Sequence, residues 1–153
     1  GTLGIENPDL VKRLAKRYPG KIIVGIDAKE GKVASCGWIN QSEVLATDLA
    51  KSYSNSQVAA IITTDIATDG TLKGPNLEAM KEMAIASTVP IIASGGVGSI
   101  SDIISLLTLE SLGISGVIVG RALYDGSIDL KEVIKAIESG HIEDPRINKS
   151  IFS

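Results

Sequence analysis

The sequence predicts an α/β fold in which parallel strands alternate with helices. Residues 90–98 (PIIASGGVG) and 116–123 (GVIVGRAL) are short apolar runs that reach glycine, and a helical pattern follows each of them. Strict alternation of strand and helix implies a parallel sheet with right-handed crossovers. The two units look like the last two βα units of a TIM-type (β/α)8 barrel, whose final loops commonly bind phosphate.

Length and composition predict one mildly acidic domain. The chain has 153 residues and a formal net charge of −3, so we expect a single domain over 1–153. No basic or aromatic patterning points to nucleic acid, and the apolar stretches are too short to cross a membrane. We expect no secretory signal. The single cysteine, Cys36, excludes an internal disulfide framework and fits the cytoplasm.

The first part of the sequence predicts two helices around one buried strand. Asn7 and Pro8 suit the start of a helix, which Pro19-Gly20 ends. Residues 21–27 form a buried strand ending at Asp27, and a turn follows at 30–32. Ser42 is expected to cap the next helix. Its apolar residues are Val44, Leu45, Leu49 and Ala50.

The second part of the sequence predicts three further strands. The expected strands are 58–64, 91–94 and 116–120, and the expected helices are 76–87, with Leu77, Met80 and Met83 inward, and 101–112. Asp129 and Glu132 form a capping box for the last helix, which Gly140 closes. From His141 onward we expect a surface tail.

These elements amount to about half of a barrel. Four complete strands and five helices are predicted, whereas a full barrel has eight strands and about 250 residues. Residues 1–4 are interpreted as the end of a further strand. We therefore expect the C-terminal (β/α)5–8 half of such a barrel.

Two strand ends carry side chains suited to chemistry. Asp27 ends an apolar strand, and catalytic side chains of this fold project from such positions. A carboxylate at a partly dry barrel mouth can act as a general acid or base, although an Asp there can also simply cap a loop. Thr64 ends the next strand, where its hydroxyl can bind substrate. Alternatively, threonine occurs there only because β-branched residues favour strands.

Glycine breaks predict phosphate binding at the barrel mouth. Gly95-Gly96 and Gly120-Arg121 occupy matched places after neighbouring strands. Glycine permits a close approach to phosphate, and the following helix N-terminus binds it. The alternative is tight turning without a ligand. Thr2 follows a third glycine and would serve a second phosphate across a twofold-symmetric barrel.

The remaining candidates are weaker. Trp38 could stack on a flat heterocycle or pack against a helix. Asp65 and Asp69 lie in a loop where Asp-Gly indicates a turn first. Cys36 has no nearby histidine, and His141 lies in the tail. No residue spacing suggests a metal site.

Several motifs together resemble one enzyme family. These motifs are 24–29 (VGIDAK), Gly37-Trp38, 63–71 (TTDIATDGT), 93–97 (ASGGV) and 119–124 (VGRALY). They resemble the C-terminal half of the phosphoribosylformimino-aminoimidazole-carboxamide ribotide (ProFAR) isomerase family of histidine biosynthesis. The resemblance covers essentially the whole chain.

The resemblance implies a cofactor-free Amadori rearrangement of a bisphosphorylated ribotide. It makes Asp27 the general acid, Thr64 a substrate contact and Trp38 the ring that stacks on the aminoimidazole. Gly95, Gly96, Gly120 and Arg121 would form one phosphate site, and Thr2 the other. The family's second aspartate, the base, lies on a first strand that these residues do not contain.

A four-strand half leaves sheet edges and an apolar face open. We therefore expect either self-association or association with an N-terminal half-barrel. Two alternatives stay open. One is the related imidazole glycerol phosphate synthase cyclase, which Gly37-Trp38 disfavours, and the other is a non-catalytic phosphate-binding half-barrel. Use of the related anthranilate-pathway substrate is undecided.

Overall fold

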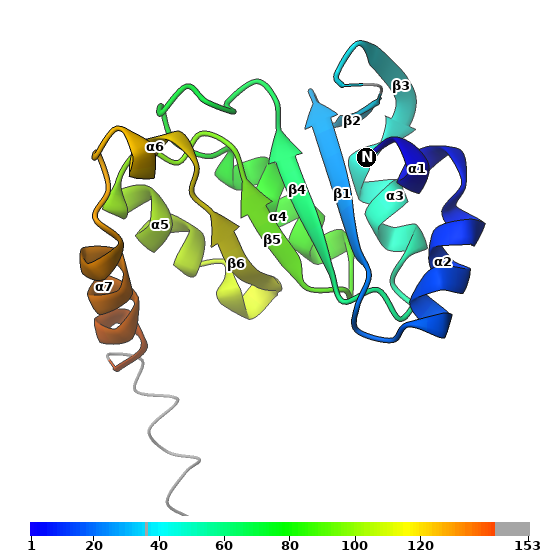
Figure 1. Ribbon diagram of the computed structural model, residues 1–153. Coiled ribbons are helices and arrows are strands. Elements are labelled where there is room, and N and C mark those ends of the chain that lie inside the picture. Colours follow the sequence, from blue (N-terminus) through cyan, green and yellow to red (C-terminus); the bar gives the residue numbers. More distant parts are fainter. Residues whose placement is uncertain (36, 143–153) are drawn as a thin grey trace, which may run out of the picture.

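A single mixed sheet organises the protein (Figure 1). The computed structural model describes residues 1–35 and 37–142. Its strand order is β3-β2-β1-β4-β5-β6. The strands, in chain order, are β1 (Ile23–Lys29), β2 (Lys32–Ser35), β3 (Asn40–Leu45), β4 (Ala60–Asp65), β5 (Ile91–Ser94) and β6 (Ile114–Ile118). In the described part the sheet is open, with β3 and β6 at its edges.

The four strands expected from the sequence form the parallel part of the sheet. β1 pairs with β4, β4 with β5 and β5 with β6, each in parallel. An α/β fold of the kind that builds part of a (β/α)8 barrel is therefore confirmed. β2 and β3 extend the sheet by antiparallel pairing, and neither strand was expected.

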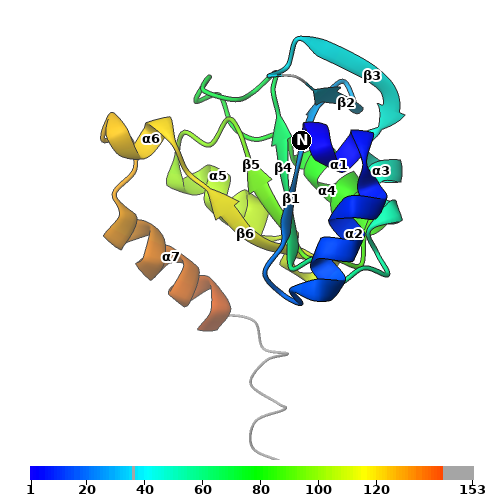
Figure 2. The same cartoon turned by 45° about the vertical axis from the view of Figure 1, so that its right-hand side comes forward.

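Helices precede, connect and follow the strands of the parallel part of the sheet. They are α1 (Thr2–Glu6), α2 (Pro8–Arg17), α3 (Ala46–Ser52), α4 (Leu77–Ala86), α5 (Ile100–Leu107), the 3-10 helix η1 (Glu110–Leu112), α6 (Arg121–Tyr124) and α7 (Leu130–Ile142). The N-cap of α2 is as predicted, because the side chain of Asn7 accepts a bond from the Leu10 amide. Asn76, expected as the first residue of the next helix, is the N-cap of α4, and its side chain accepts from the Ala79 amide. Figures 1 and 2 show α3 and α4 behind the sheet, with the opposite face toward the viewer in Figure 1.

Burial divides the sheet into a packed face and an open face. A row of residues in register, Val24, Ile61, Ile91 and Ile114, is at most 6% exposed and meets the helices. The next row, Gly25, Ile62 and Ile92, lies on the other face because side chains alternate along a strand, and it is half-buried. The core therefore sits between the sheet and the helices, and the second face lacks a comparable cover in the described part.

The structure corrects the N-terminal half of the predicted pattern. Residues 2–6 are the helix α1 and do not end a strand. β1 continues past Asp27 to Lys29, because residues 27–29 pair with β2 in a hairpin whose turn at Glu30 and Gly31 has positive φ angles of 51° and 77°.

The helix that Ser42 was expected to cap begins only at Ala46. Ser42 lies in β3, where its hydroxyl donates to the Val33 carbonyl at 2.9 Å. Val44 and Leu45, assigned to a buried helical face, are 40% and 45% exposed.

Corrections in the C-terminal half are smaller. The helix expected over 101–112 splits into α5 and η1, and the last helix extends past Gly140 to Ile142. One half of the capping box predicted for the last helix is seen, as Asp129 Oδ1 accepts from the amide of Glu132 and also from that of Lys131. Met80 and Met83 are buried as predicted, whereas Leu77 is 38% exposed. His141 lies in α7, and Cys36 and the tail beyond Ile142 lie outside the described residues.

Candidate active site

A row of polar side chains crosses the open face near the carboxyl ends of the parallel strands. Asp27 pairs in register with Thr64, and Thr64 pairs with Ser94. Residues in register on neighbouring strands point to the same face. The structure therefore brings the predicted Asp27 and Thr64 side by side, and it adds Ser94, which the sequence analysis did not select although it directly precedes Gly95.

Trp38 contacts Asp27 directly. Its indole Nε1 donates a hydrogen bond to Oδ2 of Asp27 at 3.0 Å. The hairpin explains why residues eleven positions apart meet, since Asp27 lies opposite Ala34 in the β1–β2 pairing. Trp38 is 46% exposed and is absent from the buried core, so the ring belongs to the site surface.

A small cavity of about 70 Å³ lies beyond the ends of β5 and β6. The four residues predicted for the first phosphate site, Gly95, Gly96, Gly120 and Arg121, all line it. It is completed by Asp69, Leu72, Ser94, Val97 and Ile118. Asp69, interpreted from sequence as a turn residue, thus also lines this cavity.

Glycine occupies positions 95, 96 and 120 of this cavity for different structural reasons. Gly95 and Gly96 have φ angles of 99° and 82°, and a Cβ on Gly96 would overlap the Gly74 carbonyl and lie 2.9 Å from Cβ of Thr68. Tight turning and packing therefore account for this pair. A Cβ on Gly120 would meet no heavy atom within 4 Å, so no neighbouring atom requires glycine there.

The loop between β4 and α4 forms one wall of the cavity and is fixed at several points. The buried Asp65 carboxylate accepts from the Ala67 amide at 2.9 Å and from Nδ2 of Asn76 at 2.6 Å. The Gly74 amide donates to the Gly96 carbonyl at 2.9 Å. Asp65 is thus a structural residue of this loop, as its turn pattern predicted.

Arg121 bridges this loop and the start of α6. Its Nη1 donates to the Gly70 carbonyl at 2.9 Å, and the side chain is exposed. A guanidinium has five N–H donors, so one bond to a carbonyl leaves the group able to contact an anion at the cavity.

Thr2 lies at the opposite side of the polar row. It begins α1, whose N-cap Gly1 sits near the end of β1: a Cβ on Gly1 would be 3.6 Å from Oδ2 of Asp27. β1 and β6 are separated by three strand spacings, about 14 Å. The starts of α1 and α6, where the two phosphate positions are predicted, lie on either side of β1, β4 and β5 (Figures 1 and 2).

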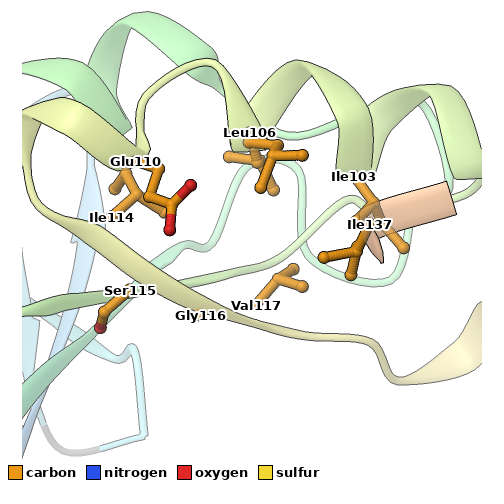
Figure 3. Close-up of a pocket in the computed structure, with 9 residues that line it drawn as sticks. Ile103, Leu106, Glu110, Ile114, Ser115, Gly116, Val117 and Ile137 are labelled. Carbon is orange, nitrogen blue, oxygen red and sulfur yellow. The ribbon is translucent and has the colours of Figure 1, made fainter. Parts of the chain in front are cut away.

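A second hollow of about 150 Å³ lies away from this row, between β6, α5 and α7 (Figure 3). Its lining is mainly apolar and includes Leu106, Ile114 and Ile137, and Figure 3 shows the Glu110 carboxylate extending into it. The hollow borders the free edge of the sheet at β6 and holds none of the predicted site residues.

Residues 1–35 and 37–142 hold no cluster of three or more His, Cys, Asp or Glu side chains placed to bind a metal ion. None of their helices is long and apolar enough to cross a membrane.

The chain is similar to known proteins. A family model described as "Histidine biosynthesis protein" matches residues 1–129. A protein of Prochlorococcus marinus (strain MIT 9313) is 64% identical over 153 residues, which are 100% of this chain and 60% of that protein. A protein of Parasynechococcus marenigrum (strain WH8102) is 65% identical over 144 residues, or 94% of this chain and 56% of its own.

Both relatives are named 1-(5-phosphoribosyl)-5-((5-phosphoribosylamino)methylideneamino) imidazole-4-carboxamide isomerase. The chain spans 60% or less of the length of these curated relatives. Because the family model covers residues 1–129, the chain belongs to the histidine biosynthesis protein family.

Proposed function

We propose that this chain supplies the Asp27-bearing part of an aldose–ketose isomerase that acts on ProFAR in histidine biosynthesis. The observation that carries the proposal is the position of Asp27 and Thr64 between two candidate phosphate positions, one at the start of α1 and one beyond the ends of β5 and β6. The name of the relatives contains two phosphoribosyl groups, so their substrate presents two phosphates. The match of a two-phosphate ligand to this arrangement supports the assignment.

The proposed reaction is an Amadori rearrangement. Asp27 donates a proton to the ribose ring oxygen, the bond from C1 to that oxygen breaks, and the nitrogen lone pair forms an iminium. A second carboxylate, supplied from outside the polar row, removes the proton on C2 to give an enolamine. The enolamine then tautomerises to the ketose. Thr64, beside Asp27, contacts the sugar, and no cofactor takes part in these steps.

The two phosphates would anchor the substrate at its ends. One would occupy the cavity lined by Gly95, Gly96, Gly120 and Arg121, where backbone amides and a guanidinium favour an anion. The other would lie at Thr2 on the far side of Asp27. Anchoring at both ends places the ribose over the carboxylate, and such positioning contributes much of an enzyme's rate.

The proposal also requires a cover for the open face of the sheet. Exposed apolar residues lie at that face or at the β6 edge, among them Ile23 at 51% and Ile118 at 42%. The apolar hollow beside β6 is open at the same edge (Figure 3). Either a second copy of this chain or an N-terminal half-barrel would cover these surfaces. Sedimentation velocity of the purified chain distinguishes the two, since only the first predicts a dimer without an added segment.

The decisive experiment is turnover of ProFAR by the purified 153-residue chain, alone and with an added N-terminal half-barrel of a relative. We expect Asp27→Asn to lower kcat by about 10²–10⁴, the usual contribution of a general acid. Glu78→Gln on α4 changes an exposed carboxylate that lies 3.9 Å from Nζ of Lys81, and this matched control should retain activity.

A non-catalytic role is the alternative outcome of that experiment. A chain that binds ribose 5-phosphate but turns over no ProFAR in either preparation would be a phosphate-binding half-barrel. Conversion of the cyclase substrate in place of ProFAR would instead assign the chain to the related imidazole glycerol phosphate synthase reaction.

A cytoplasmic location stays a prediction.

A further inference from the structure

Trp38 occupies an unusual position for a large aromatic residue. Its φ angle is 72°, and that of the preceding Gly37 is 66°. The left-handed region is costly for a side chain other than glycine, and such outliers cluster at functional sites. A Cβ on Gly37 would meet no atom within 4 Å. Crowding at Gly37 therefore does not explain this backbone conformation.

The contact that orients the ring is the hydrogen bond to Asp27. Nε1 lies 3.0 Å from Oδ2 of the carboxylate, and nearly half of the residue is exposed. Among the described residues the indole N–H has a single polar partner of this kind, the Asp27 carboxyl oxygen, and this bond fixes where the edge of the ring points.

The same bond constrains Asp27. The carboxylate is half-buried on the open face, in register with Thr64. A carboxylate can rotate about its terminal torsion, and an N–H donor bound to one oxygen restricts that rotation. A general acid must point its oxygen at the atom that it protonates, so a donor that fixes the carboxylate affects the chemical step.

We propose that Trp38 is a positioning residue for Asp27, because its indole N–H fixes the orientation of that carboxylate on the open face of the sheet. The catalytic consequence rests on the function proposed above, whereas the contact itself does not. The left-handed backbone at Gly37 and Trp38 is the conformation that returns the ring to the carboxylate after β2.

The first test uses intrinsic fluorescence. The chain holds a single tryptophan, so its emission reports on Trp38 alone. We expect Asp27→Ala to release the ring and to raise acrylamide quenching, up to about twofold given that 46% of the residue is already exposed. Glu43→Ala is the matched control. It removes another carboxylate from the same β-hairpin region, one that pairs with Lys32 at 2.7 Å, and it should leave quenching at the wild-type value.

Two fluorescence results overturn the proposal. Wild-type quenching in Asp27→Ala means that the carboxylate does not hold the ring. An equal rise in both variants means that the strands around Trp38 have loosened as a whole. Circular dichroism of each variant verifies that the fold is retained. If Asp27→Ala does not fold, Asp27→Ser replaces it, because serine stays polar but is shorter than aspartate.

The second test separates positioning from binding. Trp38→Phe keeps an aromatic ring and removes the N–H donor. In a preparation that turns over ProFAR, we expect kcat to fall about tenfold, the upper end of what one lost hydrogen bond contributes, while KM changes less than kcat. A rise in KM at constant kcat would overturn the positioning role. Absence of turnover in the wild type would refute the isomerase proposal, and the fluorescence comparison would then decide the contact by itself.

Discussion

The substitution Gly96→Ala tests how the phosphate cavity is built. Gly96 has a φ angle of 82°, and a Cβ there would overlap the Gly74 carbonyl and approach Cβ of Thr68 to 2.9 Å. The left-handed conformation costs about 1–2 kcal/mol for a residue other than glycine. Overpacking against fixed backbone adds about 1–3 kcal/mol. We therefore expect a loss of about 2–5 kcal/mol in the free energy of unfolding.

Gly20→Ala separates these two contributions. Gly20 also has a positive φ angle, 69°, but a Cβ there would meet nothing within 4 Å. It should cost only the conformational part, about 1–2 kcal/mol. Urea unfolding followed by far-ultraviolet circular dichroism measures both variants at one protein concentration, because association shifts apparent stability. Equal losses in the free energy of unfolding for Gly96→Ala and Gly20→Ala would show that the β4–α4 loop moves away from the new Cβ at no energetic cost. The argument from close packing would then be wrong.

Three further predictions concern other parts of the fold. Asn76→Ala removes the N-cap of α4 and a donor to the buried Asp65 carboxylate, and urea unfolding should show a loss of about 2–4 kcal/mol. Burial raises the pKa of Tyr53 above 10.0, so the unfolded chain loses this proton first. The free energy of unfolding should therefore fall as the pH rises above 10.0, and Tyr53→Phe should remove that part of the fall. Gly120→Ala should destabilise the protein less than Gly96→Ala and should weaken binding of inorganic phosphate in calorimetry, because its Cβ enters open space beside the cavity.

The parallel strands could be predicted from sequence because their signals are local. Each is a short apolar run bounded by glycine, proline or a polar cap, and a strand buried among helices needs no finer pattern. The helix starts at Asn7 and Asn76 could also be predicted from local sequence, because a capping side chain accepts hydrogen bonds from amides only two or three residues away. The convergence of Gly95, Gly96, Gly120 and Arg121 on one cavity followed from the parallel topology.

The β2–β3 region could not be predicted in the same way. Ser42 followed by Val44 and Leu45 is compatible with a capped helix, and only pairing with β2 makes it a strand. That pairing rests on the Ser42 bond to the Val33 carbonyl and on the ion pair of Lys32 with Glu43. Such contacts between distant positions leave no periodic signal in either segment. The Trp38 contact with Asp27 depends on the same hairpin and was invisible for the same reason.

The two glycine breaks look alike in sequence but differ in their physical cause. Gly96 is required by a positive φ angle and by contact with the loop that ends at Gly74, whereas Gly120 has no neighbour that excludes a side chain. Evidence for a ligand therefore comes from the open space at Gly120 and from Arg121, and not from the Gly-Gly pair. Gly96 would act on the ligand indirectly, because it allows the β4–α4 loop to close one wall of the cavity. Glycine thus supports a packing role at position 96, after β5, and a ligand-binding role at position 120, after β6.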